Sequence, residues 1–167
     1  TSIGMLTLKH SIVRSATNEP LSETDGQVTR AWADALIELA AHEVGLVISG
    51  HFCVDASQRA DEGQPVVDEK TDREILRYAA DGVHQYGSKV LIQLSHSGIK
   101  AMEALNGIPP KHPEDFTSQE LDRLVERFAS AARRCQDCGA DGVQIHTAHG
   151  YLLSNFLNPA ENLRTDE

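Results

Sequence analysis

The chain has 167 residues, of which 40% are hydrophobic and 24% are charged, and its formal net charge at pH 7 is −10. These values are typical of one soluble globular domain, and an acidic chain repels the phosphate backbone of nucleic acids. No apolar run approaches the roughly 18 residues of a membrane span, and residue 1 does not open a signal peptide. The odd number of cysteines (Cys53, Cys135 and Cys138) favours reduced thiols in a cytoplasm. We therefore expect a cytoplasmic protein that binds neither nucleic acid nor membranes.

The first third of the chain predicts a hairpin, a short strand and a helix. Residues 3–8 have the pattern of a hairpin and residues 11–17 that of a short strand. Thr29 is a suitable N-cap for a helix that runs to about Glu43. Four apolar residues recur at helical spacing along it: Trp32, Leu36, Leu39 and Ala40.

A second unit of strand, loop and helix follows. Residues 45–49 form a continuous apolar run bounded by glycine, which is typical of a strand that is buried on both faces. Residues 55–68 are polar and are predicted to form a loop. A helix is predicted over residues 71–86, and its apolar stripe is typical of core packing rather than of a cofactor site.

Residues 89–96 predict a further strand, and the glycine- and proline-bearing residues 97–115 predict a long loop. Thr117 and Glu120 then form the pattern of a capping box, which predicts a helix start. We expect this helix to reach about Cys138. Residues 141–146 complete the pattern as a fourth strand.

The alternation of strands and helices predicts an α/β fold with parallel strands. The long loops follow strands rather than helices, as in a (β/α)8 barrel, which places its active site there. A closed barrel needs about 250 residues. We therefore expect residues 1–167 to be the N-terminal half of one barrel domain, truncated at its C-terminal end, or to pack against a second half-barrel. An open doubly wound parallel sheet is the alternative fold.

The strongest functional signal lies in residues 145–167. His146 and His149 follow a predicted buried strand and precede Tyr151. Two neutral imidazoles could ligate a metal. Alternatively, they could hold an anionic oxygen while Tyr151 donates a proton. A third alternative is that both histidines lie in a surface loop and have no catalytic or binding role.

This segment resembles the Old Yellow Enzyme family, especially the NADH:flavin oxidoreductase branch related to dienoyl-CoA reductases and bacterial ene-reductases. Residues 6–19, 45–54 and 89–98 resemble earlier strands of that family. The matching residues of the C-terminal motif are His146, His149, Gly150, Tyr151, Leu152, Leu153, Phe156, Leu157, Pro159, Asn162, Arg164 and Asp166.

The resemblance implies an FMN enzyme that takes hydride from NADH or NADPH and reduces an activated alkene, enone or related small molecule. His146 and His149 would hydrogen-bond the oxygen of this acceptor, and Tyr151 would supply the proton. His146 would also lie near the flavin, and Gln93 would bind the pyrimidine side of the flavin ring. The N5–O4 side of the ring would be supported by the backbone of Ser15, Ala16, Thr17, Asn18, Gly50 and His51.

Three positions depart from the family pattern. Asn18 stands where many relatives have Thr or Cys, which puts the redox potential of the flavin in doubt. Gly50 and His51 stand where some relatives have Glu and Ala, and His10 replaces the usual Asn of the opening motif. An imidazole at position 51 could alter the site or point elsewhere.

Two other functions stay open. One is a metal-dependent barrel hydrolase or lyase that uses His146 and His149, with His96 as an optional third ligand, although no carboxylate partner is evident on an adjacent strand end. The other is a non-catalytic half-barrel, because the family binds the FMN phosphate with residues beyond position 167. An iron–sulfur cluster is expected only if a longer chain carries its cysteines, since Cys135 and Cys138 fit a packing role. The expected partners are a small-molecule substrate and either a second copy or a second half-barrel.

Overall fold

The structure is a computed structural model that describes residues 1–166. Its centre is a parallel sheet with strand order β3-β4-β5-β6, as the predicted α/β class requires. The strands are β3 (Val13–Arg14), β4 (Leu46–Cys53), β5 (Lys89–Ser95) and β6 (Gly142–Ile145). Their spatial order follows the sequence without the reversal that a doubly wound sheet contains. The sheet is therefore one half of a (β/α) barrel.

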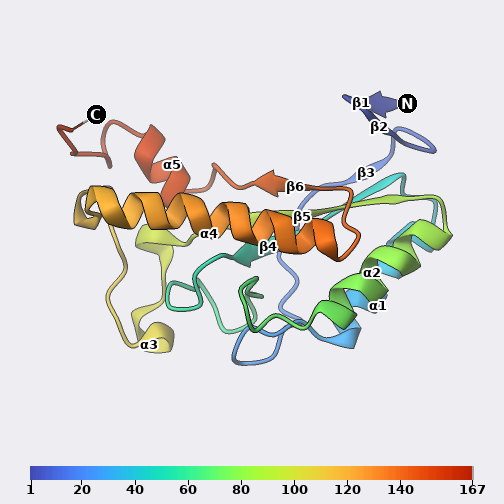
Figure 1. Cartoon of the computed structure of the whole chain (residues 1–167), viewed down its shortest axis with the longest axis horizontal. Coiled ribbons are helices and arrows are strands. Elements are labelled where there is room, and N and C mark those ends of the chain that lie inside the picture. The colour runs from blue at the N-terminus through green and yellow to red at the C-terminus, as the bar shows by residue number, and fades with distance from the viewer. Residues whose placement is uncertain (167) are drawn as a thin grey trace.

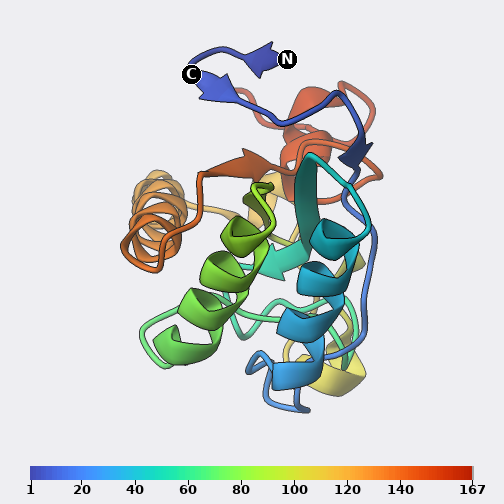
Figure 2. The same ribbon diagram turned by 90° about the vertical axis from the view of Figure 1, so that its right-hand side faces the viewer.

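Three long helices cover one face of this sheet: α1 (Arg30–Ala41), α2 (Arg73–Gln85) and α4 (Ser118–Asp137) (Figures 1 and 2). Each packs its apolar side against the strands β4 to β6. Trp32 of α1 meets Phe52 of β4 edge to face, with the ring centroids 5.3 Å apart. Such a pair contributes about 0.5–1.5 kcal/mol beyond its buried area. The main hydrophobic core therefore lies between the helices and the sheet.

The predicted helix starts are largely confirmed. Thr29 accepts a hydrogen bond from the backbone N–H of Trp32, and Thr117 and Glu120 form the expected capping box. The helix α2 begins two residues later than predicted, because the Thr71 hydroxyl bonds to the loop carbonyl of Val66 and leaves the capping role to the next residue. The predicted strand over residues 11–17 pairs only at β3.

The opposite face of the sheet carries the N-terminal hairpin of β1 (Ser2–Ile3) and β2 (Leu6–Thr7), which is antiparallel as predicted (Figure 2). Leu8 follows this hairpin and packs against Leu46 and Ile48 in a second, smaller apolar cluster. The hairpin segment therefore supplies an apolar residue to the inner face of the half-barrel.

The predicted loop over residues 97–115 is partly helical, which corrects the sequence prediction. It contains the short helices η1 (Gly98–Lys100), α3 (Glu103–Asn106) and η2 (Pro113–Asp115). The side chain of Asn106 donates to the carbonyl of Arg59 and accepts from its N–H, at 2.8 and 3.1 Å. This tie to a distant loop organises the segment, and sequence periodicity cannot reveal it. The last helix, α5, spans Leu152–Leu157.

A β-bulge interrupts β4 near the carboxyl end of the sheet. Ile48 pairs with Leu91 and His51 pairs with Gln93, so two residues of β4 stand opposite one residue of β5. The hydroxyl of Ser49, in the bulge, accepts the N–H of Gln93 at 3.1 Å. Strict alternation would turn His51 toward the helices, but the bulge turns it to the side of Gln93.

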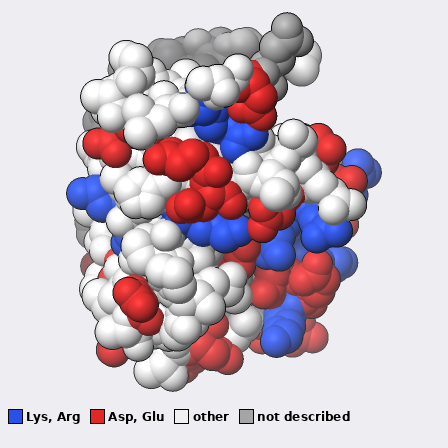
Figure 3. Space-filling view, turned by 90° about the vertical axis from the view of Figure 1, so that its left-hand side faces the viewer, with Lys and Arg blue, Asp and Glu red and all other residues white. Residues whose placement is uncertain are grey.

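The arrows of β4 and β6 point to the left in Figure 1, so Figure 3 looks onto the carboxyl ends of the strands. Acidic and basic side chains are intermixed on this face (Figure 3). No helix within residues 1–166 has the length and apolar character to cross a membrane.

Candidate active site

A cavity of about 420 Å³ opens at the carboxyl ends of the strands. The segment after β3, the middle of β4 and β5, and the end of β6 with its following loop all contribute to it. Its lining residues are Ala16, Thr17, Asn18, His51, Gln93, Gln144, Ile145, His146, Thr147, Ala148, His149 and Tyr151. Most of the site residues predicted on four separate segments therefore lie around one cavity.

The turn after β6 brings two histidines and a tyrosine together. His146 follows the strand and continues its ladder by donating its N–H to Leu94 at 2.9 Å. His149 and Gly150 then both have positive φ angles, of 60° and 73°, and reverse the chain. As a result, the ring centroid of His146 lies 5.5 Å from that of His149 and 4.8 Å from that of Tyr151.

Hydrogen bonding fixes the tautomer of His146. The backbone N–H of Ala148 donates to its Nδ1 at 3.2 Å, so this nitrogen is unprotonated and the ring proton lies on Nε2. Burial, with the neighbouring His51 and His149, lowers the pKa of His146 to about 4. Burial also raises the pKa of Tyr151 above its ordinary value. At neutral pH the site therefore offers uncharged N–H and O–H donors.

Two amides stand beside these donors. Gln93 of β5 donates from Nε2 to Oε1 of Gln144 on β6, at 2.6 Å. Both residues line the cavity, and within residues 1–166 their remaining amide atoms, Oε1 of Gln93 and Nε2 of Gln144, have no hydrogen-bond partner. Gln144 was not predicted as a site residue. Its position two residues before His146, on the same face of the strand, is the signal that could have found it.

Two of the predicted residues do not line the cavity. The carbonyl of Ser15 instead accepts hydrogen bonds from Arg14 and from Thr17, at 2.7 and 3.3 Å. Gly50 lies beneath the segment after β3, where a Cβ atom would stand only 2.6 Å from the carbonyl oxygen of Thr17. The absence of a side chain at Gly50 therefore allows that segment to approach the sheet.

His96 lies apart from this cavity. It is 2% exposed, and its Nδ1 accepts the N–H of Gly98. Its ring packs edge to face against that of Phe116, with the ring centroids 5.9 Å apart. Burial lowers its pKa to about 4. It lines a different cavity of about 230 Å³, next to Asp55. No three His, Cys, Asp or Glu side chains among the described residues form a group that could hold a metal ion. The metal hypothesis therefore loses His96 as its optional third ligand.

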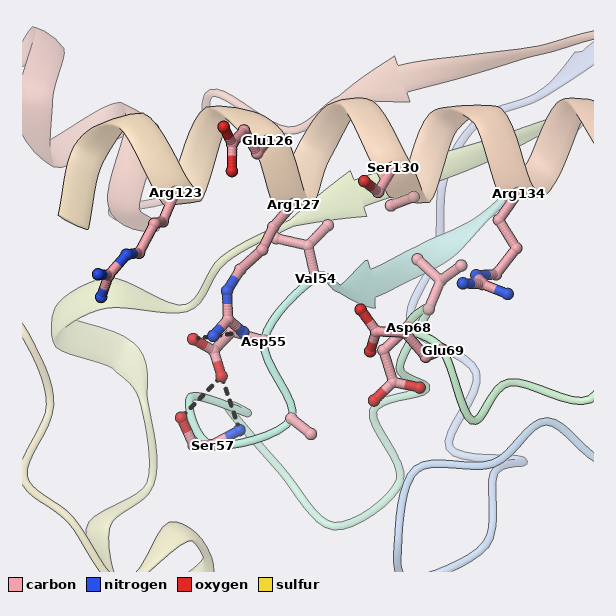
Figure 4. A pocket seen from close by; sticks show the side chains of 13 residues that line it. Val54, Asp55, Ser57, Asp68, Glu69, Arg123, Glu126, Arg127, Ser130 and Arg134 are labelled. Carbon is pink, nitrogen blue, oxygen red and sulfur yellow. Dashed lines mark hydrogen bonds and ion pairs between the residues drawn. The ribbon is translucent and has the colours of Figure 1, made fainter. Parts of the chain in front are cut away.

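Another cavity, of about 530 Å³, lies along α4 on the helical side of the sheet (Figure 4). Arg127 of α4 pairs with Asp55 at 3.0 Å, and Asp55 also accepts from the hydroxyl of Ser57. These groups tie α4 to the loop after β4. Cys135 and Cys138 are also buried on this side, against α2 and β5, as a packing role predicts.

The fold and the site together define one half of a (β/α)-barrel enzyme. Its candidate active site lies at the carboxyl ends of the strands. The model of the NADH:flavin oxidoreductase / NADH oxidase family matches residues 1–167, and the chain belongs to this family.

Relatives support this assignment along nearly the whole chain. The chain is 29% identical to an NADH oxidase of Thermoanaerobacter brockii, covering 99% of this chain and 28% of the relative. It is 34% identical to an NADPH dehydrogenase of Bacillus subtilis, covering 97% of this chain and 51% of the relative. An old yellow enzyme homologue from Zymomonas mobilis superposes with a TM-score of 0.89 and 25% identity, over 98% of this chain and 52% of that chain. The chain thus spans about half or less of these proteins.

Proposed function

We propose that residues 1–167 form the N-terminal half of a single-barrel, FMN-dependent oxidoreductase that passes hydride from NADH or NADPH to an activated alkene or enone. The observation that carries this proposal is the convergence of His146, His149, Tyr151 and Gln93 on one cavity. The family membership supports a flavin and a nicotinamide reductant. The acceptor class and the choice of FMN are inferred from the chemistry of the site and the likeness to the family.

The residues on the cavity wall fit a flavin ring. The pyrimidine part of a flavin presents alternating hydrogen-bond donors and acceptors, and the Gln93–Gln144 pair, which lines the cavity, has one free acceptor and one free donor. The close approach of Thr17 over Gly50 supplies a backbone wall beside them. In this proposal the side chain of Gln93 holds the ring, and the backbone of Ser15, Ala16, Thr17, Asn18, Gly50 and His51 supports it.

A bound flavin supplies the hydride chemistry at this site. The chain itself contributes hydrogen-bond donors and a proton. His146 donates from Nε2, and together with His149 it binds and polarises the oxygen of the acceptor, as preorganised donors do at developing negative charge. Tyr151 keeps its proton at neutral pH, since burial raises its pKa, and delivers this proton to the acceptor.

The proposed whole enzyme needs a second half-barrel, either in the same polypeptide or in a partner. The family relatives are about twice the length of this chain or longer. In the complete protein, β3 and β6 would pair with strands of that second half, which would also hold the flavin phosphate.

Cofactor analysis tests the proposal directly. The complete protein, with both half-barrels, should retain flavin after incubation with FMN and gel filtration, identified by its absorbance spectrum and by mass spectrometry of the released cofactor. Anaerobic addition of NADH or NADPH should bleach that spectrum, and an enone should restore it. A protein that retains no flavin would support the non-catalytic half-barrel instead.

A further inference from the structure

We infer that His51 is a third imidazole hydrogen-bond donor of this site, and that Gln64 is the positioning residue that fixes the tautomer of His51. The functional part of this inference rests on the proposed oxidoreductase function. The donor would bind an uncharged oxygen, such as a carbonyl, of a ligand in the cavity.

The β-bulge is the first step of the argument. It turns His51 to the same side of the sheet as Gln93, where the imidazole is 6% exposed and lines the cavity. The ring centroid of His51 lies 5.0 Å from that of Tyr151 and 5.9 Å from that of His146, both edge to face. His51 therefore packs against two of the proposed functional residues and limits the positions that their rings can take.

The orientation of the Gln64 amide is determined by its other partners. Gln64 is completely buried, and its Oε1 accepts the backbone N–H of Ala60 at 2.6 Å and the hydroxyl of Ser97 at 3.3 Å. A backbone N–H can only donate, so the atom facing it must be the amide oxygen. The amide nitrogen of Gln64 must then face His51.

This orientation determines where His51 carries its proton. Nε2 of Gln64 stands 2.8 Å from Nδ1 of His51, and an amide nitrogen can only donate. Nδ1 is therefore unprotonated, and the ring proton lies on Nε2. Protonation of both nitrogens would direct two N–H groups at each other. Burial also lowers the pKa of His51, which favours the same neutral form.

The Nε2–H group of His51 is available to a ligand. Within residues 1–166 it has no hydrogen-bond partner, and it is not one of the unpartnered polar atoms that are inaccessible to solvent. Because His51 lines the cavity, an acceptor for this N–H would come from a molecule bound there. His51 and His146 would then present two neutral Nε2–H donors to the same space.

Nitrogen-15 NMR of the histidine side chains tests the tautomer in the intact protein. Between pH 6.5 and 8, Nδ1 of His51 should have the chemical shift of an unprotonated nitrogen and Nε2 that of a protonated one. The His51→Gln variant identifies the signal by its loss. A protonated Nδ1 in the unmodified protein would overturn the inference, and this measurement needs no bound flavin.

The variant Gln64→Glu inverts the proposed hydrogen bond, because a carboxylate can only accept. His51 should then carry its proton on Nδ1 or become an imidazolium with a raised pKa. Gln119→Glu adds the same charge at an exposed position of α4 and should leave the His51 signal unchanged. If Gln64→Glu fails to fold, Gln64→Met removes the donor without adding charge and should populate both tautomers. An unchanged signal in a folded Gln64 variant would contradict the assigned role.

The variant His51→Phe tests the ligand-binding part, since it keeps an aromatic ring but removes the N–H. Loss of one hydrogen bond should weaken the binding of a carbonyl-bearing acceptor by about 2- to 12-fold. Unchanged affinity would overturn the donor role. If the protein shows the expected tautomer of His51 but cannot bind flavin, only the proposed function is refuted. If the protein binds flavin but Nδ1 of His51 is protonated, only this inference is refuted.

Discussion

The ring of Tyr151 lies with its centroid 4.8 Å from that of His146, and both side chains face the cavity at the carboxyl end of the sheet. One group is an imidazole and the other a phenol. Both are protonated on the atom that can donate, and both are uncharged at neutral pH. The pair can therefore polarise one part of a substrate and protonate another. The first two predictions separate these roles.

The double variant His146→Ala/His149→Ala should slow reoxidation of the reduced flavin by an enone about 10²- to 10³-fold, as expected for the loss of preorganised donors. Reduction of the flavin by NADH or NADPH should slow less, because no substrate oxygen develops negative charge in that half-reaction. Stopped-flow measurement of each half-reaction separates the effects. Equal losses in both halves would count against the assignment.

The variant Tyr151→Phe removes the proposed proton donor and keeps the ring that packs against His51 and His146. Reduction of the enone should slow by about 10²- to 10⁴-fold, and flavin reduction should be nearly unaffected. The rate at which the enone reoxidises the reduced flavin, followed by stopped-flow absorbance, gives the readout. An unchanged oxidative rate would assign proton delivery to another group or to water.

The variant Gly50→Ala should destabilise the protein by about 1–3 kcal/mol, because its Cβ would stand 2.6 Å from the carbonyl oxygen of Thr17. Gly107→Ala is a useful control, since nothing lies within 4 Å and only its φ of 71° is unfavourable. That control should cost about 1 kcal/mol. Urea unfolding measures both. A Gly50 variant as stable as wild type would show that the segment after β3 yields easily.

Stability should fall as the pH is lowered from 6.5 toward 4. Burial lowers the pKa of both His96 and His146 to about 4, from an ordinary value of 6.5. In this window the unfolded chain binds more protons than the folded chain, so acid favours unfolding. Each such histidine contributes a slope of about 1.4 kcal/mol per pH unit. Urea denaturation across this range measures the slope, and a flat profile would mean that folding does not lower the pKa of these rings.

Much of the fold follows from local sequence signals. The caps at Thr29 and Thr117 determine where two helices begin, and the continuous apolar runs locate the buried strands. The motif from His146 to Tyr151 located the site, because it directly follows a strand that ends at the active edge of the sheet. These features depend on neighbouring residues, which a sequence displays.

Other features depend on contacts between distant segments. The bulge that turns His51 into the cavity lies where Thr17 approaches Gly50 and where His51 pairs with Gln93. Gln64 lies in a polar loop and acquires a role only when that loop folds over His51. Periodicity within one segment carries no information about either contact.

A crystal structure of the complete, FMN-loaded protein would test the central claim most directly. The account predicts that the flavin ring lies within hydrogen-bond distance of Gln93 and of the backbone near Thr17, with His146, His149 and Tyr151 around its open face. A flavin bound elsewhere, for example in the cavity along α4, would contradict it.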